Sequence, residues 1–236
     1  MKEPFISVII PTLNEEAYIE ATLRAIKNQD YKGGYEVIVA DGMSKDSTLK
    51  IARKYADKVI KIKKRGVSVG RNAGAKIARG DIFLFIDADT VASFNLLAEF
   101  AKSFNKKVVG VTCPVLPLSS NATDFIVYWF YNQFVKTSVC TRKPHVAGIC
   151  CAYRREAFEK IGGFNENLKT VEDFDFSERI SKLGKITIAN STFVMTSPRR
   201  IERWGKTKAA ARYIKIYLNY LLVGKTVGID KYRPIR

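Results

Sequence analysis

Short runs of apolar residues alternate along this chain with segments in which apolar residues recur at helical spacing. The most apolar run, residues 82–86, reads Ile-Phe-Leu-Phe-Ile and is followed by Asp-Ala-Asp. Five consecutive apolar residues are typical of a strand that is buried on both faces, as in the sheet of an α/β protein. Comparable runs predict strands at residues 5–10, 35–40, 58–62, 108–113 and 147–153. Lysines alternate with Val and Ile in residues 58–62, which favours the edge of the sheet for that strand.

The segments between these runs predict helices. They are expected at residues 15–28, 47–55, 65–80, 93–104, 124–137, 154–161 and 170–184. Thr12 or Asn14 is expected to cap the first helix, and Asn121 offers a cap-like start to the helix at 124–137. Strands that alternate with helices in this way form β-α-β units, so the sequence predicts a doubly wound, mainly parallel sheet flanked by helices.

The predicted helix at residues 65–80 carries glycines at positions 66, 70 and 74. This spacing matches neither the dinucleotide-binding fingerprint nor a Walker A loop. Small residues on one helix face allow the helix to pack close to the sheet, and Arg71 in the same segment can point at a phosphate.

Two carboxylates, Asp87 and Asp89, directly follow the buried strand at residues 82–86. Ligands of α/β proteins bind at the carboxyl ends of the strands, so these side chains are expected at a binding site. Their oxygens suit a hard divalent cation, Mg²⁺ or Mn²⁺, that is shared with the phosphates of a substrate. The alternative is that the two aspartates cap the following helix.

The composition of the 236 residues is ordinary for one large domain, but the net charge of +17 is not. Such a charge predicts an anionic partner: a nucleotide, a nucleic acid or an acidic membrane surface. The four cysteines show no Cys-x-x-Cys spacing and the single histidine is His145, so we expect reduced thiols, no zinc site and a structural histidine. The first apolar run is too short for a signal peptide, and no stretch reaches the length of a membrane span.

The end of the chain is strongly basic. Residues 199–236 contain eleven Lys or Arg and two acidic residues, a net charge of +9. Within them, residues 207–223 predict an amphipathic helix with a polar stripe of Lys208, Arg212, Lys215 and Asn219. Such a helix suits the interface of an anionic membrane, and the aromatic run at residues 125–131 offers a second apolar contact. The alternative is that both helices pack on the rest of the protein.

Six short motifs follow one another in a fixed order. They are Pro11-x-x-Asn14-Glu15, Asp41-Gly42-x-Ser44, Gly70-Arg71-Asn72-x-Gly74, Asp87-x-Asp89, Gly162-Gly163-Phe164 and Glu172-Asp173. Together they resemble the family 2 glycosyltransferases of the GT-A fold, over residues 5–205. Residues 200–204, Arg-Ile-Glu-Arg-Trp, also look like the Gln-x-x-Arg-Trp motif of processive members. Arginine replaces the glutamine and the transmembrane helices of those polymerising enzymes are missing, so polymer synthesis is not expected.

The resemblance implies a role for each matching residue. Pro11, Thr12 and Glu15 would line the nucleotide pocket, Asp41 would bind the base or ribose edge, and Arg71, Arg200 and Arg203 would bind the diphosphate. Asp89 would bind the metal with support from Asp87, which would also bind the ribose. Asp173 would be the general base, with Glu172 beside it, and Trp204 would stack on the acceptor. It further implies a nucleotide-binding half at about residues 1–115 and an acceptor half at about 116–205, followed by a basic extension at 206–236.

The implied activity is an inverting transfer of a sugar from a UDP- or GDP-linked donor to a hydroxyl or phosphate of a lipid-linked acceptor. The residue types suit this chemistry, because arginines and a divalent ion stabilise the leaving diphosphate and one carboxylate takes the acceptor proton. We expect a cytoplasmic enzyme at the inner face of the cell membrane.

A sugar-phosphate nucleotidyltransferase is the second enzymatic interpretation, but this chain lacks a glycine-rich loop after its first strand. A basic membrane- or nucleic-acid-binding module is the third; the chain shows no nucleic-acid-binding motif, and nucleic acid is not expected as a partner.

Overall fold

The computed structural model describes residues 3–141, 143–168 and 170–205, together with residues 208, 209, 211, 212, 215 and 220. The strands are β1 (Ile6–Thr12), β2 (Tyr35–Asp41), β3 (Lys58–Lys61), β4 (Ile82–Ile86), β5 (Thr90–Ala92), β6 (Val108–Thr112), β7 (Val115–Pro117), β8 (Cys150–Arg154), β9 (Lys185–Ile188) and β10 (Val194–Thr196). The helices are α1 (Ile19–Lys27), α2 (Thr48–Tyr55), α3 (Val67–Ile77), α4 (Leu96–Ser103), α5 (Ala122–Val139), α6 (Arg155–Lys160), α7 (Glu172–Ile180) and α8 (Arg199–Trp204).

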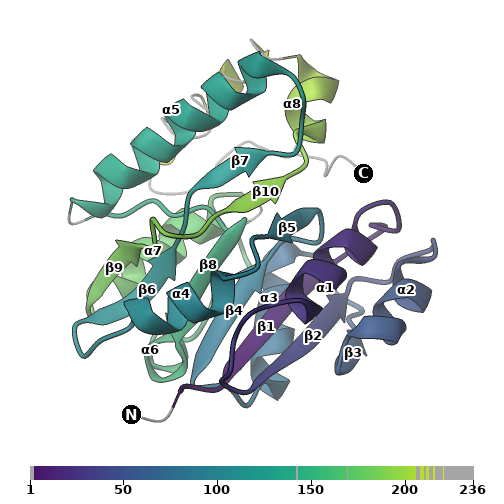
Figure 1. The fold of residues 1–236 in the computed structure, drawn as a ribbon, viewed down its shortest axis with the longest axis horizontal. Coiled ribbons are helices and arrows are strands. Elements are labelled where there is room, and N and C mark those ends of the chain that lie inside the picture. The colour runs from purple at the N-terminus through teal and green to yellow at the C-terminus, as the bar shows by residue number, and fades with distance from the viewer. Residues whose placement is uncertain are drawn as a thin grey trace.

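Seven strands form the large sheet, in the order β3-β2-β1-β4-β8-β6-β9 (Figure 1). All neighbours are parallel except β8, which runs antiparallel to β4 and β6. The chain moves outward from β1 to β3 on one side and then returns to place β4 on the other side of β1. This reversal creates a topological switch point at the carboxyl ends of β1 and β4, where doubly wound sheets bind their ligands.

Helices cover both faces of the large sheet, because successive residues of each strand point to opposite faces and both sets are apolar. In β4, Ile82, Leu84 and Ile86 pack with α1, α2 and α4, whereas Phe83 and Phe85 pack on the opposite face with α6 and α7. The second face is rich in aromatic rings; those of Phe85 and Phe158 lie 5.4 Å apart between centroids. Burial on both faces explains the continuous apolar run from which this strand was predicted.

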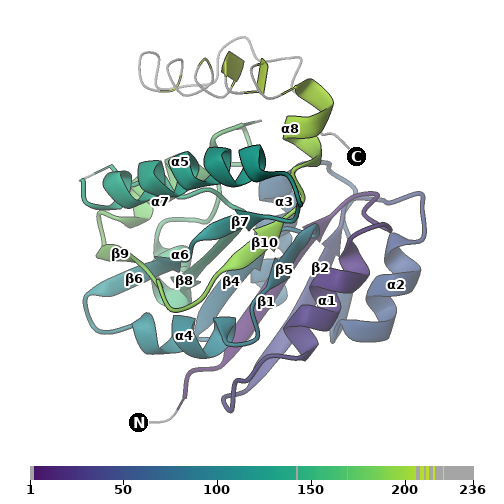
Figure 2. The same ribbon diagram turned by 45° about the horizontal axis from the view of Figure 1, so that its top comes forward.

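A smaller sheet, β5-β10-β7, lies beside the large one and carries two helices. Strands β7 and β10 run parallel, with Pro117 opposite Thr196, so they end side by side. Helix α5 begins shortly after β7 and α8 shortly after β10, and the start of α5 therefore lies next to α8 in both views (Figures 1 and 2).

Most predicted elements are present, with shifted ends. Asn121 caps α5 as expected, since its side chain accepts a hydrogen bond from the Thr123 N–H. The predicted cap of α1 is wrong: the helix begins at Ile19, and Tyr18 is its N-cap residue. The Thr12 hydroxyl instead donates to Asp41 at the end of β2, and the Asn14 side chain accepts from the Lys45 N–H in the loop that follows.

Three other expectations concern the short strands and the chain end. The strands β5, β7, β9 and β10, of three or four residues each, and the helix α8 were not predicted. Neither aspartate of the Asp-x-Asp sequence caps α4, because β5 intervenes and Asn95 is the N-cap residue. The amphipathic helix expected at residues 207–223 falls mostly outside the described residues. Across the described part of the chain, no helix combines the length and apolarity needed to cross a membrane.

Helix α3 approaches the sheet as closely as its glycines predicted. A Cβ atom on Gly74 would lie 2.4 Å from Cγ2 of Ile9, and one on Gly70 would lie 2.9 Å from Cβ of Pro11. Real Cβ atoms do not come this near, so α3 rests on β1 only because these positions lack side chains. This contact also fixes where Arg71 leaves the helix.

We predict that Gly74→Ala lowers stability, although alanine is intrinsically the better helix residue. Overpacking of a tight contact costs about 1–3 kcal/mol, whereas Gly to Ala in an open helix would gain about 1 kcal/mol. The unfolding midpoint in urea gives the free energy of unfolding. Lys76→Ala, at an exposed position of α3, is the matched control and should change it little. Equal or higher stability of Gly74→Ala would contradict the packing described here.

Candidate active site

The carboxyl ends of β1, β2 and β4 bring polar side chains to the switch point of the sheet. Asp41, the last residue of β2, is fully buried and accepts hydrogen bonds from the Thr12 hydroxyl at 3.2 Å and the Ser44 N–H at 2.9 Å. Pro11 lies beneath Gly70 of α3. These contacts join the ends of β1 and β2 to the loop that follows β2.

Arg71 of α3 is the buried cation of the site. Its side chain is 3% exposed, and its guanidinium contacts Glu172 at 3.0 Å, Asp87 at 3.2 Å and the carbonyl oxygen of Gly148 at 2.9 Å. Burial lowers the pKa of Arg71, but the nearby carboxylates Asp87 and Glu172 outweigh this and raise the pKa above its ordinary value. Gly148 must be a glycine here, because a Cβ atom would lie 2.2 Å from Nη2 of Arg71.

The first residues of α7 bring two acids into this site. Val171, the N-cap residue, has a left-handed backbone with φ of 56°, which is rare for a β-branched residue and typical of functional turns. The Asp173 carboxylate accepts hydrogen bonds from the Gly148 N–H at 2.8 Å and the Phe174 N–H at 2.9 Å. Burial, and then repulsion from Glu172, raise the pKa of Asp173 to about 6. Such a group can exchange a proton near neutral pH.

A second arginine, Arg199 at the start of α8, holds the other side of the site. It makes a two-pronged ion pair with Glu15, at 2.7 and 2.8 Å, and contacts Asp89 at 3.0 Å. Sequence analysis missed Arg199, although it named the adjacent Arg200. The pairing joins residues 184 positions apart, and the only sequence signal was the Arg-Arg pair after Pro198.

The two aspartates of the Asp-x-Asp sequence thus each contact an arginine. Burial raises the pKa of Asp87 to about 7, with Asp89 adding repulsion and the charges of Arg71 and Arg200 opposing the rise. No three His, Cys, Asp or Glu side chains among the described residues converge to form a complete metal site. Two carboxylates suit a hard divalent cation that takes its remaining ligands from water and substrate phosphates. The donor set therefore fits a shared Mg²⁺ or Mn²⁺, and Asp89 and Asp87 are the side chains that would hold it.

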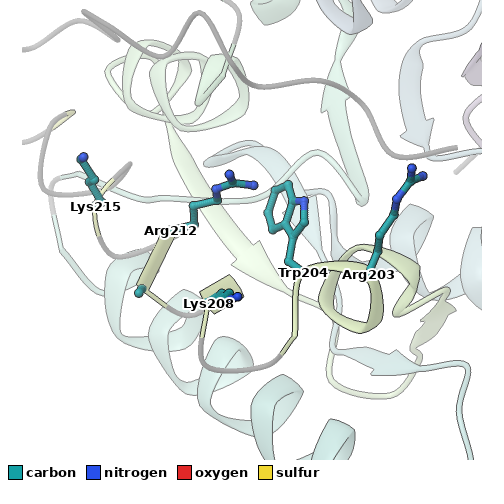
Figure 3. Close-up of a pocket in the computed structure, with 6 residues that line it drawn as sticks. Arg203, Trp204, Lys208, Arg212 and Lys215 are labelled. Carbon is teal, nitrogen blue, oxygen red and sulfur yellow. The ribbon is translucent and has the colours of Figure 1, made fainter.

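The remaining predicted residues lie on α8. Arg203 and Trp204 line an open pocket together with Lys208, Arg212 and Lys215, and Figure 3 shows the Trp204 indole between the side chains of Arg203 and Arg212. The Arg212 guanidinium lies 4.6 Å from the centre of the indole ring, a cation–π distance. Lys208, Arg212 and Lys215 were predicted to share a polar stripe, but their position beside Trp204 was not predicted.

The structure therefore joins half of the predicted site residues through direct contacts in two networks. One network is Arg71, Asp87, Glu172 and, through Gly148, Asp173; the other is Arg199, Glu15 and Asp89. Arg71 was expected beside a diphosphate, and here both its charged contacts are carboxylates. His145 is buried, with its ring 2.9 Å from Glu178 and stacked against Phe134, consistent with the structural role expected for it.

Comparison with known proteins identifies relatives of this chain. Residues 7–162 match the family model described as glycosyl transferase family 2. The glycosyltransferase AglE of Haloferax volcanii is 39% identical over 195 residues, which cover 77% of this chain and 62% of AglE. A Methanococcus voltae protein named dolichyl N-acetyl-α-D-glucosaminyl phosphate 3-β-D-2,3-diacetamido-2,3-dideoxy-β-D-glucuronosyltransferase is 27% identical over 246 residues, covering 92% of this chain and 71% of that protein.

The fold has a counterpart among solved structures. The mannosyltransferase PcManGT of Pyrobaculum calidifontis, solved with GDP-Man and Mn²⁺, superposes with a TM-score of 0.68 at 24% identity. The match covers 91% of this chain and 65% of PcManGT, so the chain spans less than two thirds of this neighbour and of AglE. The likeness confirms the predicted fold class, a mixed, mainly parallel sheet of the GT-A type.

We predict that Arg71→Met destabilises the protein by about 3–5 kcal/mol, because it leaves buried carboxylates without their cation. Arg71 lowers the pKa of the buried Asp87, so without this cation that pKa rises further above its value in the unfolded chain. The folded variant then binds more protons than the unfolded one, so its loss in free energy of unfolding relative to wild type should grow from pH 5 to pH 8. Urea unfolding at both pH values measures this.

The matched control is Arg155→Met, which breaks an exposed ion pair with Glu159. It should cost less than about 1 kcal/mol, with little dependence on pH. If Arg71→Met is no less stable than this control, the buried ion pairs do not hold the site together.

Proposed function

The chain belongs to glycosyl transferase family 2, and from that premise we propose that it transfers a sugar from a nucleotide-diphosphate donor to an acceptor hydroxyl or phosphate, with inversion at the anomeric carbon. The observation that carries this proposal is the meeting of the Asp-x-Asp carboxylates, Arg71 and Asp173 at the switch point of a GT-A sheet. That place in the fold is where a doubly wound sheet binds a nucleotide.

In this proposal the donor nucleotide lies across the ends of β1 and β2. Asp41 and Thr12 form one wall for the base and ribose, with Pro11 and Glu15 beside them, and Asp87 contacts the ribose. The diphosphate then faces the arginines of α3 and α8: Arg71, Arg200 and Arg203, to which we add Arg199. Guanidinium groups suit phosphate because they offer several donors in one plane.

A divalent ion, when bound, would neutralise the charge that develops on the leaving diphosphate. Asp89 would be its direct protein ligand and Asp87 would support it. PcManGT was solved with both GDP-Man and Mn²⁺, which supports a cation of this kind beside a nucleotide sugar here.

Asp173 is the proposed general base. The acceptor oxygen attacks the anomeric carbon, the bond from that carbon to the diphosphate oxygen breaks, and the acceptor proton passes to Asp173. One displacement needs one base and no covalent nucleophile on the protein. Glu172 holds Arg71 and adds to the repulsion that tunes the Asp173 pKa, so it acts as a positioning residue. Trp204 would stack on the acceptor.

We further propose a lipid-linked acceptor, for which the name of the Methanococcus voltae relative offers support. It names a dolichyl-linked sugar phosphate, and that protein covers most of the present chain. Residues 1–205 would form the transferase domain, with a nucleotide half at about 1–115 and an acceptor half at about 116–205. Residues 206–236 would be a basic extension.

Asp173→Asn is expected to lower kcat by about 10²–10⁴ while donor affinity is retained. The wild-type pH profile gives an independent measure. Because Asp173 works deprotonated and its pKa is about 6, kcat/KM should fall about tenfold per pH unit below pH 6 and level off above it. Steady-state release of nucleoside diphosphate measures both effects.

Asp175→Asn, on the same helix and ion-paired with Arg179, is the matched control and should keep near-normal turnover. Asp173 would be excluded as the base if its amide variant kept full kcat, or if only donor affinity collapsed.

Asp89→Asn is expected to leave the protein folded but to abolish transfer, because a neutral amide is a poor ligand for a hard cation. Mn²⁺ binding, measured by electron paramagnetic resonance with a nucleoside diphosphate present, should weaken at least tenfold. Asp30→Asn, at an exposed position, should behave as wild type. Undiminished Mn²⁺ binding by Asp89→Asn would remove Asp89 from the metal site.

A further inference from the structure

Helix α5 has a buried side and, opposite it, an exposed apolar side. The buried side faces the small sheet and carries Asp124, Tyr128, Val135 and Ser138 at helical spacing, with Tyr131 partly buried beside them. On the opposite side of its first three turns lie Phe125, Ile126, Trp129 and Phe130, which we call the outer patch. Their exposed fractions are 45%, 55%, 56% and 64%.

This arrangement is unusual for a helix at a protein surface. Surface helices normally carry polar residues opposite their buried stripe, and helices that are apolar all round lie in a core or in lipid. The rings of Trp129 and Phe130 pack edge to face, 4.9 Å apart between centroids, and the four side chains of the outer patch line one open hollow. Surfaces of this kind mark contact sites for proteins or membranes.

A group of basic residues follows α8, which lies beside the start of α5. Because β7 and β10 end side by side, the start of α5 lies next to α8 (Figure 2). Helix α8 leads into the exposed side chains of Lys208, Arg212 and Lys215, which we call the basic rim (Figure 3). Further along, the Tyr220 ring packs 6.0 Å from His145, whose ring also stacks on Phe134 of α5. The described residue Tyr220 therefore lies beside the later turns of α5.

We propose that the outer patch and the basic rim together bind the surface of an anionic lipid bilayer. Aromatic residues such as Trp129 favour the boundary between lipid headgroups and acyl chains, and cations beside them attract anionic headgroups. Helix α5 would lie in the plane of the interface with its outer patch inserted, which needs no membrane-spanning segment.

Charge argues for lipid over a second copy of this chain. The protein carries +17, and a symmetric dimer through α5 would bring two basic rims toward each other. An anionic bilayer instead supplies the complementary charge over an area as wide as the patch. This inference goes beyond the proposed transfer reaction, because binding to lipid needs neither donor nor acceptor.

The test is co-sedimentation of the full chain with vesicles of phosphatidylcholine and phosphatidylglycerol at low salt. The variant Trp129→Gln/Phe130→Gln removes the two most exposed members of the outer patch. It should bind about 30-fold more weakly, since it loses the insertion of two large apolar side chains. Phe94→Gln is the matched control: Phe94 is 68% exposed, but it precedes α4, on the part of the molecule away from α5 (Figure 1). It should bind as wild type.

The basic rim is tested separately with Lys208→Gln/Arg212→Gln/Lys215→Gln. Each cation near an anionic leaflet strengthens binding about fivefold, so this variant should lose about 100-fold. The loss should shrink in pure phosphatidylcholine vesicles and at high salt.

Insertion has its own readout, because Trp129 and Trp204 are the two tryptophans of the sequence. In a Trp204→Phe chain, Trp129 fluorescence should shift to shorter wavelength with anionic vesicles and be quenched by brominated lipid. The proposal fails if the wild-type chain stays in the supernatant or if the patch variant sediments like Phe94→Gln. It also fails if the fluorescence of Trp129 does not change when vesicles are added. Self-association that the patch variant abolishes, without vesicle binding, would assign the patch to a second copy instead.

Discussion

The buried guanidinium of Arg71 is the interaction on which the site depends. It comes from α3 in the first half of the chain and contacts the end of β4 through Asp87, α7 through Glu172 and the loop before β8 through the Gly148 carbonyl. Carboxylates taken out of water repel one another unless a cation offsets them. Arg71 supplies that cation at a point that three separate elements share, so the same contact that balances charge also fixes their relative positions. The close approach of α3 to β1, which its glycines permit, sets the root of this side chain.

Five carboxylates gather around two guanidinium groups: Glu15, Asp87, Asp89, Glu172 and Asp173 with Arg71 and Arg199. Burial is the main cause of the raised pKa values of Asp87, about 7, and Asp173, about 6; repulsion from Asp89 and Glu172 adds to the rise, and Arg71 opposes it. A divalent cation with a diphosphate would change this balance at one edge of the site. The arginines would then have phosphate oxygens as alternative partners. The balance of charge between these acids and arginines is thus one reason why both residue types occur together in the site.

Local patterns predicted what depends on local sequence. The run at residues 82–86 identified β4 because burial on both faces requires apolar residues at every position, and Asp87 and Asp89 followed directly from it. The first cap prediction was wrong because Thr12 bonds to Asp41 at the end of β2 and Asn14 to the loop after it, contacts that a local rule does not include. Arg199 was missed for a related reason. Its partners Glu15 and Asp89 are distant in sequence. Whether Arg199 or Arg200 contacts them depends on the direction in which α8 leaves β10, which the local sequence does not show.

The small sheet links the site to the outer face of the molecule. Strand β10 pairs with β5, which follows the Asp-x-Asp sequence, and also with β7, which leads into α5. The Ser197 N–H then bonds to the Asp89 carbonyl at 3.1 Å, directly before α8 presents Arg199 to the Asp89 side chain. Backbone hydrogen bonds therefore run without a break from the α5 side of the small sheet to the proposed metal ligand. Since hydrogen-bonded strands move together more readily than separate loops, the position of α5 and the position of Arg199 are set by one unit of structure.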